Sequence, residues 1–124
     1  MSKEEGKRTV VLGASPNPAR YANKAVHKLL DKGHAPLLVG IRKGSIADIP
    51  IQIGQPDISD VDTVTVYVGP KHQGAYEDYI LSLKPNRIIF NPGAENPAFG
   101  KRAREEGIEV AYACTLVMLS TGQF

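Results

Sequence analysis

Five short apolar runs, rich in valine and isoleucine, recur along the chain and constrain its fold more than any other feature. Each run has about the length of a strand, and unbroken apolar character is typical of strands buried on both faces of a sheet. The runs are Arg8 to Leu12, Pro36 to Val39, Thr63 to Val68, Arg87 to Phe90, and Glu109 to Tyr112. We therefore predict a sheet of five strands that is covered on both sides.

Helical patterns lie between most of these runs. After the first run, apolar residues recur at the spacing of one helix face, and Gly33 follows as a stop signal. Their positions are Ala22, Ala25, Val26, Leu29 and Leu30. After the third run the same spacing returns, and Pro85 ends it because the residue before a proline disfavours helical angles. That second set is Tyr76, Tyr79, Ile80 and Leu83. Both segments are predicted to be amphipathic helices.

A third helix is predicted after the fourth run, with Asn96 at the N-cap, Pro97 at the first helical position and Gly107 just past the end. Thr115 to Thr121 is expected to form a last short helix. By contrast, residues 44–60 are rich in Gly, Pro and Asp, which predicts a loop with a short strand near Ile51 to Ile53.

Strands that alternate with helices call for right-handed crossovers and a parallel sheet. The chain has 124 residues, the size of one domain. The predicted fold is a single Rossmann-like three-layer α/β domain over residues 1–124, with a mainly parallel five-stranded sheet.

In open sheets of this kind, ligands bind outside the carboxyl ends of the strands. The loop there after the first run reads GASPNPAR. Gly13 permits a sharp turn, and the small residues Ala14 and Ser15 leave room for a group to approach the backbone. The following helix would aim its free N–H groups at the same space, which favours an anion such as phosphate. The alternative is a tight connection that binds nothing.

Basic residues follow three of the strand ends. The G-x-G-x-x-G fingerprint of dinucleotide-binding loops is absent, and Arg42 and Lys43 stand where an acidic residue would hold a ribose 2′-hydroxyl. Arg20 follows the first run, and Lys71 and His72 follow the third. Cations at this edge favour a ligand that carries phosphate on or near its ribose, such as coenzyme A or NADP, over NAD or FAD.

The stretch VVLGASPNPARYANKAVHKLLDKGH resembles the opening of small, stand-alone CoA-binding domain proteins, whose fold is shared with the N-terminal domain of the succinyl-CoA synthetase α subunit. The matching residues are Gly13, Ala14, Ser15, Pro16, Pro18, Arg20 and Gly33. The resemblance continues through KRAREEGIEV to Cys114. It implies that coenzyme A lies across the strand ends, with its phosphates near residues 13–20 and its adenosine near Arg42 and Lys43.

No catalytic apparatus is evident. His27 and His34 fall within and just after the first predicted helix, and His72 is expected to be a ligand contact or a surface residue. Cys114 is expected to be structural, with a mixed disulfide to coenzyme A as the alternative. No side chains have the spacing of metal ligands. We therefore predict that the protein is not an enzyme.

Charge and hydropathy limit the classes of partner that the chain is expected to have. The net charge is +2, no apolar run approaches the roughly 18 residues that span a bilayer, and the tyrosines do not interleave with basic residues. Neither a membrane nor a nucleic acid is therefore expected as a partner. One cysteine and an N-terminus without an apolar leader favour the cytoplasm. The predicted function is binding of coenzyme A or an acyl-CoA. The alternatives are an NADP-dependent oxidoreductase fragment and an interaction module that forms a homodimer or binds another protein.

Overall fold

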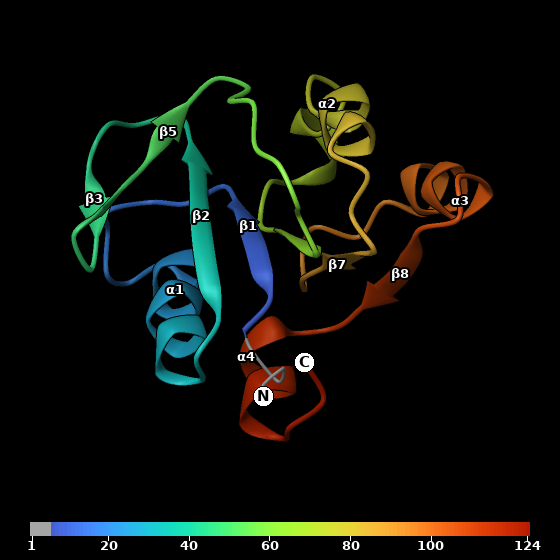
Figure 1. Cartoon of the computed structure of the whole chain (residues 1–124). Helices are drawn as coiled ribbons and strands as arrows, with labels where there is room; N and C mark the ends of the chain where they lie inside the picture. The colour runs from blue at the N-terminus through green and yellow to red at the C-terminus, as the bar shows by residue number, and fades with distance from the viewer. Residues whose placement is uncertain (1–5) are drawn as a thin grey trace.

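The computed structural model describes residues 6–124, which fold around one central sheet (Figure 1). The strands of the chain are β1 (Arg8–Leu12), β2 (Ala35–Gly40), β3 (Ser45–Ile46), β4 (Ile49–Pro50), β5 (Gln52–Ile53), β6 (Thr63–Val66), β7 (Arg87–Phe90) and β8 (Glu109–Tyr112). The helices are α1 (Tyr21–Asp31), the short 3-10 helix η1 (Pro70–His72), α2 (Glu77–Ser82), α3 (Pro97–Glu105) and α4 (Thr115–Ser120).

The central sheet has six strands in the order β5-β2-β1-β6-β7-β8, and every neighbouring pair is parallel. The Rossmann-like α/β fold is therefore confirmed, but the predicted count of five strands was wrong. The sixth strand is β5, whose two residues pair with Val39 and Gly40 at the end of β2. The short strand predicted near Ile51 to Ile53 is therefore present, but its place in the main sheet was not predicted, because a pairing of two residues depends on a neighbouring strand edge.

A second difference is the small antiparallel sheet of β3 and β4, within the segment predicted to be mainly loop. Its turn places Ala47 and Asp48 at positive φ, 51° and 66°. Alanine is a poor residue for such a turn because its Cβ disfavours left-handed angles. The sequence therefore lacked the usual Gly or Asn signal of a hairpin.

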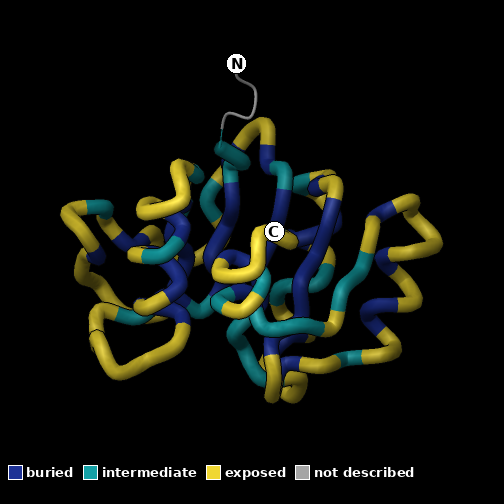
Figure 2. The backbone as a smooth tube through the Cα atoms, turned by 90° about the horizontal axis from the view of Figure 1, so that it is seen from below, coloured by how far each residue is buried: buried dark blue, intermediate teal, exposed yellow. Residues whose placement is uncertain are grey.

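The core lies on both faces of the sheet, because successive strand residues point to opposite sides. Val10 and Leu12 pack with Ile80 and Phe99 on the face covered by α2 and α3. Val11 packs on the opposite face with residues of α1 and α4, namely Ala22, Val26, Leu29 and Leu119. In Figure 2 the residues of β1, β6 and β7 are mostly dark blue, whereas those of β8 at the sheet edge are intermediate or exposed, like much of the loops and the outer helix turns. This is the predicted three-layer arrangement.

The helix predictions hold, with local corrections. The Asn96 side chain accepts a hydrogen bond from the Phe99 N–H at 3.1 Å, so α3 begins at its predicted cap. Gly33 and Gly107 follow α1 and α3 with a φ of 83° each, as expected for helix stops. Leu30 was predicted to lie on the buried face of α1 but is 39% exposed, because it lies at the margin of that face. The last helix, α4, ends at Ser120.

Candidate functional site

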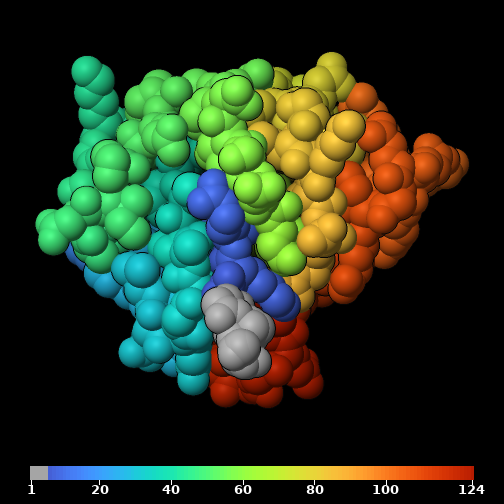
Figure 3. All heavy atoms as spheres, viewed as in Figure 1, coloured from blue at the N-terminus to red at the C-terminus, as the bar shows by residue number. Residues whose placement is uncertain are grey.

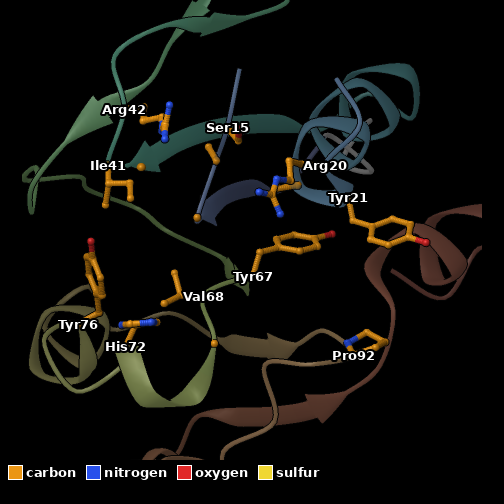
Figure 4. A pocket seen from close by; sticks show the side chains of 15 residues that line it. Ser15, Arg20, Tyr21, Ile41, Arg42, Tyr67, Val68, His72, Tyr76 and Pro92 are labelled. Atoms are coloured by element: carbon orange, nitrogen blue, oxygen red, sulfur yellow. The ribbon is translucent and has the colours of Figure 1, made fainter. Parts of the chain in front are cut away.

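A cleft of about 920 Å³ opens at the carboxyl end of the sheet, between the segments that follow β1, β2, β6 and β7 (Figure 4). Its lining residues are Gly13, Ala14, Ser15, Arg20, Tyr21, Ala22, Gly40, Ile41, Arg42, Tyr67, Val68, Gly69, His72, Tyr76 and Pro92. Six of the nine predicted site residues are among them: Gly13, Ala14, Ser15, Arg20, Arg42 and His72. The structure thus brings the segments at the ends of β1, β2 and β6 to one cavity.

The turn after β1 is held by the end of β2. Gly13 has a φ of 98°, and the N–H groups of Gly13 and Ala14 both donate to the Val39 carbonyl, at 2.9 and 3.0 Å. A Cβ on Gly40 would lie 2.4 Å from the Ala14 carbonyl oxygen, so only glycine fits at that point of β2. The amides of Gly13 and Ala14 therefore stabilise the turn and are not free for an anion, contrary to the expected use of this loop.

The start of α1 offers free amides instead. Its N-cap, Arg20, makes no capping hydrogen bond through its side chain, and no acidic residue stands in the first turn. Tyr21 and Ala22, the first helical residues, line the cleft. The uncapped N–H groups and the helix dipole together give a positive potential there, which suits a phosphate group.

The loop that leads into α1 is fixed by its own side chains. Asn23 is buried at 4% exposure, and its Nδ2 donates to the Ser15 carbonyl at 2.9 Å. The Asn17 N–H donates to Ser15 Oγ at 3.1 Å, and Asn17 Oδ1 accepts from the Ala19 N–H at 3.0 Å. These bonds hold the small residues beside the cleft in one conformation.

Arg20 and Arg42 lie on different sides of this loop and both reach the same cleft (Figure 4). Both are exposed, and neither takes part in an ion pair within residues 6–124, where Arg102 pairs with Glu77 and Asp78. Because no carboxylate of the described chain neutralises them, both guanidinium groups are available to an anionic ligand.

The other three predicted residues lie next to the cleft but do not line it. Pro16 packs against Gly44, since a Cβ on that glycine would lie 3.0 Å from the Pro16 Cβ. Lys43 and Lys71 are exposed and adjacent in sequence to the lining residues Arg42 and His72. Their role in binding stays a prediction.

A buried glutamine positions the segment that carries His72, and the sequence analysis missed it. Gln73 is fully buried, and its Nε2 donates to the carbonyls of Val68 and Ala94 at 2.9 and 2.7 Å. Its Oε1 accepts from Asn96 Nδ2 at 3.0 Å. Gln73 thereby ties η1 to the loop after β7. A glutamine that follows a lysine and a histidine is typical of an exposed segment, so nothing in the sequence indicated that Gln73 is buried.

The end of the cleft nearest α4, here called the aromatic end, is lined by the aromatic rings of Tyr21 and Tyr67 and by the proline ring of Pro92 (Figure 4). The Tyr67 hydroxyl is buried without a hydrogen-bond partner, although the hydroxyls of Thr115 and Thr65 are near. Burial raises the pKa of Tyr67 to about 12. The phenol therefore stays protonated at neutral pH and cannot act there as a base.

A buried polar cluster lies behind Tyr67. Thr65 Oγ1 and Thr115 Oγ1 are 2.7 Å apart, Asn91 Nδ2 donates to Thr65 Oγ1 at 2.7 Å, and the Thr115 N–H donates to Asn91 Oδ1 at 2.8 Å. The cluster ties α4 to the ends of β6 and β7. Cys114, half-buried, is the N-cap residue of α4 and is not among the residues that line the cleft.

The remaining chemistry-bearing residues lie away from the cleft. His34 is at the opposite end of the sheet, where its Nδ1 accepts from the Lys7 N–H at 2.9 Å. His27 is exposed on α1. Within residues 6–124, no group of His, Cys, Asp and Glu side chains is arranged to hold a metal ion. The same residues include no helix with the length and apolar character needed to cross a membrane.

Solved structures share this fold over nearly the whole chain. An uncharacterized protein is 47% identical, with a TM-score of 0.94 over 96% of this chain and 98% of its own. A protein from Thermus thermophilus, cell-free ID.343, is 24% identical, with a TM-score of 0.78 over 96% of this chain and 91% of its own. A comparison with curated proteins finds no match.

A larger enzyme contains a similar domain. The dinucleotide-forming acetyl-coenzyme A synthetase 1 of Ca. Korarchaeum cryptofilum is 17% identical, with a TM-score of 0.69 over 88% of this chain and 26% of its own. At this identity the likeness concerns the fold alone. The model of the CoA binding domain matches residues 7–120 of this chain, and none of the comparisons supports the NADP alternative. The cleft at the carboxyl end of a parallel sheet is thus carried by a chain that belongs to the CoA-binding domain family.

Proposed function

We propose that the protein binds coenzyme A or an acyl-CoA in the cleft at the carboxyl end of the sheet. The observation that carries this proposal is the placement of Arg20, Arg42 and the uncapped start of α1 around one cavity. Two separate segments supply positive charge or free amides there, and coenzyme A carries phosphates at two separate positions. Membership in the CoA-binding domain family supports the same ligand.

In this proposal, Arg42 contacts the 3′-phosphate of the ligand, with Lys43 close behind it. Arg20 and the first amides of α1 contact the pyrophosphate, which suits an anion at a helix N-terminus. The adenine then lies toward Ile41, His72 and Tyr76, which line the same end of the cleft as Arg42 (Figure 4).

We further propose that the protein is a binder rather than an enzyme. General acid–base and nucleophilic catalysis need a group held by partners next to the reacting atoms. The phenol of Tyr67, whose pKa burial raises to about 12, does not meet that need. The lone cysteine supports an expected place of action in the reducing cytoplasm.

Isothermal titration tests the proposal with coenzyme A, dephospho-coenzyme A and NADP as separate ligands. We expect coenzyme A to bind and dephospho-coenzyme A to bind roughly tenfold more weakly, because a hydrogen bond to a charged group contributes about 1.5 to 3 kcal/mol net, and the exposed Arg42 falls at the lower end of that range. NADP should bind more weakly than coenzyme A. Absence of heat from coenzyme A and acetyl-CoA at millimolar concentration contradicts the proposal.

Charge-removal variants locate the ligand. Arg42→Ala should weaken coenzyme A roughly tenfold and remove the difference between coenzyme A and dephospho-coenzyme A. Arg20→Ala should weaken both ligands alike. Lys101→Ala is the matched control, since this exposed cation lies on α3 and outside the cleft lining. An equal loss from Lys101→Ala would mean that general charge, rather than the cleft, attracts the ligand.

A protein partner or a homodimer stays a prediction. Size-exclusion chromatography with and without coenzyme A tests whether the protein self-associates and whether the ligand changes that association.

A further inference from the structure

The two ends of the cleft differ in chemistry. At one end lie Arg42 and His72 together with Ile41 and Tyr76, and at the other lie Tyr21, Tyr67 and Pro92 (Figure 4). Arg20 also lines the cleft. The Arg42 end thus combines a cation with apolar and aromatic side chains, whereas Tyr21, Tyr67 and Pro92 present rings with no cation among them.

The aromatic end presents apolar surface to the cavity. Tyr21 is 67% exposed, a high value for a large aromatic side chain. Within residues 6–124 its ring makes no contact with another aromatic ring, and one cation lies over it: Lys24 Nζ, 5.3 Å from the ring centroid. Tyr67 is half-buried, but its hydroxyl oxygen is fully buried. The part of Tyr67 that remains accessible is therefore its ring, not its polar atom.

The proposed ligand has a matching polarity. The phosphates of coenzyme A occupy one end of the molecule, and the thiol or acyl thioester lies at the other end, beyond an uncharged chain. If the phosphates contact Arg42, Arg20 and the start of α1, the sulfur end lies toward the three aromatic-end residues. A free thiol would leave most of the exposed Tyr21 ring in water, whereas an acyl chain would cover it.

We propose, on the basis of the coenzyme A proposal above, that this end is an acyl subsite and that Tyr21 determines its specificity. The protein then prefers acyl-CoA thioesters with an uncharged acyl chain over free coenzyme A. A chain that ends in a carboxylate is disfavoured, because its charge would lose water against apolar rings. Lys24, whose Nζ lies 5.3 Å from the Tyr21 ring centroid, is exposed and outside the cleft lining, so it offers such a carboxylate only a weak, solvent-screened partner. Arg20, the nearest cation in the cleft, is already engaged by the pyrophosphate in this arrangement.

Calorimetric titration with four ligands tests the acyl subsite: coenzyme A, acetyl-CoA, butyryl-CoA and succinyl-CoA. Full burial of one methylene group tightens binding roughly fourfold. In this open cleft we expect butyryl-CoA to bind roughly four- to sixteenfold more tightly than acetyl-CoA, from two added methylenes. Succinyl-CoA has the same chain length as butyryl-CoA but a terminal carboxylate, and it should lose that gain.

Tyr21→Ser should remove most of the butyryl gain, measured as the ratio of butyryl-CoA to coenzyme A affinity within the same variant, so that any change in phosphate binding at the start of α1 affects both ligands alike. Val117→Ser is the matched control, because Val117 is 57% exposed on α4 and outside the cleft lining. Tyr67→Phe keeps the ring and should keep the acyl preference. Circular dichroism confirms that each variant is folded.

Two results would overturn the acyl subsite alone: equal affinity of the wild-type protein for coenzyme A and butyryl-CoA, or a full butyryl gain retained by Tyr21→Ser. In both cases coenzyme A still binds, so the proposed function stands. If no CoA species binds, the proposed function and the acyl subsite both fail.

Discussion

The two ends of the sheet use the same residue types in opposite ways. At the amino end, Arg87 is buried, its guanidinium lies 4.6 Å from the Phe124 ring centroid, and it donates to Thr63 Oγ1 at 3.1 and 3.2 Å. Lys7 Nζ donates to the Phe124 carbonyl at 2.6 Å. At the carboxyl end, Arg20 and Arg42 are exposed and line a cavity.

The difference shows when a cation has a structural role. At the amino end, the last residues of the chain lie against the residues at the start of β1, where red and blue atoms meet near the bottom of Figure 3. Phe124 supplies its aromatic ring and its carbonyl as partners of the cations there. At the carboxyl end, glycine turns keep the loops short and leave the cations facing the cavity. Partners, not residue type, separate a structural arginine from one available to a ligand.

The largest expected effect is at the amino end. Arg87→Ala should lower the free energy of unfolding by about 2 to 3 kcal/mol, because it leaves Thr63 without its donors and removes the cation over Phe124. Denaturant unfolding measures this loss. Coenzyme A affinity should stay unchanged, and Arg42→Ala should change stability by less than about 0.5 kcal/mol. A stability loss from Arg42→Ala equal to that from Arg87→Ala would break the comparison.

Gly40→Ala tests the turns of the carboxyl end. The new Cβ would meet the Ala14 carbonyl oxygen, so the loop after β1 must move, at a cost of about 1 to 3 kcal/mol. Coenzyme A should also bind more weakly, because the shifted loop lines the cleft. Gly74→Ala is the matched control: nothing lies within 4 Å of its added Cβ, and its stability should change by less than about 0.5 kcal/mol.

Tyr67→Phe tests whether a buried hydroxyl at the carboxyl end of the sheet contributes to stability. Within the described residues, the Tyr67 hydroxyl is the buried side-chain group without a hydrogen-bond partner. Its removal should leave stability unchanged or raise it by up to about 1 kcal/mol, as measured by thermal unfolding. A clear loss of stability would show that Thr65 or Thr115 does bond to this hydroxyl. Thr65→Val serves as the contrast, because it removes an acceptor that Asn91 uses and should be destabilising.

The smallest effect concerns pH at the amino end. Burial, with Lys7 and Arg87 nearby, lowers the pKa of His34 below its ordinary value of 6.5. The unfolded state then binds the proton more readily, so stability should fall as the pH drops from 6.5 through the lower pKa of the folded state. Unfolding midpoints at pH 7.5 and 5.5 measure this slope.

His34→Asn should reduce that pH dependence, because asparagine keeps an acceptor for the Lys7 N–H but cannot be protonated. His27→Asn, on the exposed side of α1, is the matched control and should keep the slope of the wild-type protein. An unchanged slope in His34→Asn would contradict the assignment to His34.

Much of the fold could be predicted because its signals are local. Val10, Val64 and Ile88 belong to apolar runs that only a sheet covered on both faces can bury, and Asn96 and Gly107 mark helix ends through their own backbone geometry. The pairs β3–β4 and β5–β2 were harder to predict, since strands of two residues depend on neighbouring chain rather than on their own pattern.

The candidate site, like the fold, was predicted only in part. Residues in the glycine turn and the basic loops, such as Gly13 and Arg42, could be selected because parallel strands place their carboxyl ends at one edge. The sequence did not indicate Tyr21 and Tyr67 as cleft residues or Gln73 as a support. An aromatic or amide side chain has the same local signal whether it lines a cavity, packs in the core or faces water.

The sequence alone determined the order of the five longer strands and of the helices α1 to α4, the parallel sheet and the edge at which a ligand site should lie, because these follow from periodicity and chain connectivity. Only the tertiary structure decided which polar groups are already satisfied. The amides of Gly13 and Ala14 bond to Val39, Arg87 bonds to Thr63, and Arg20 and Arg42 stay unpaired within residues 6–124. Hydrogen bonds between distant segments depend on distances of a few ångströms, which no local pattern encodes.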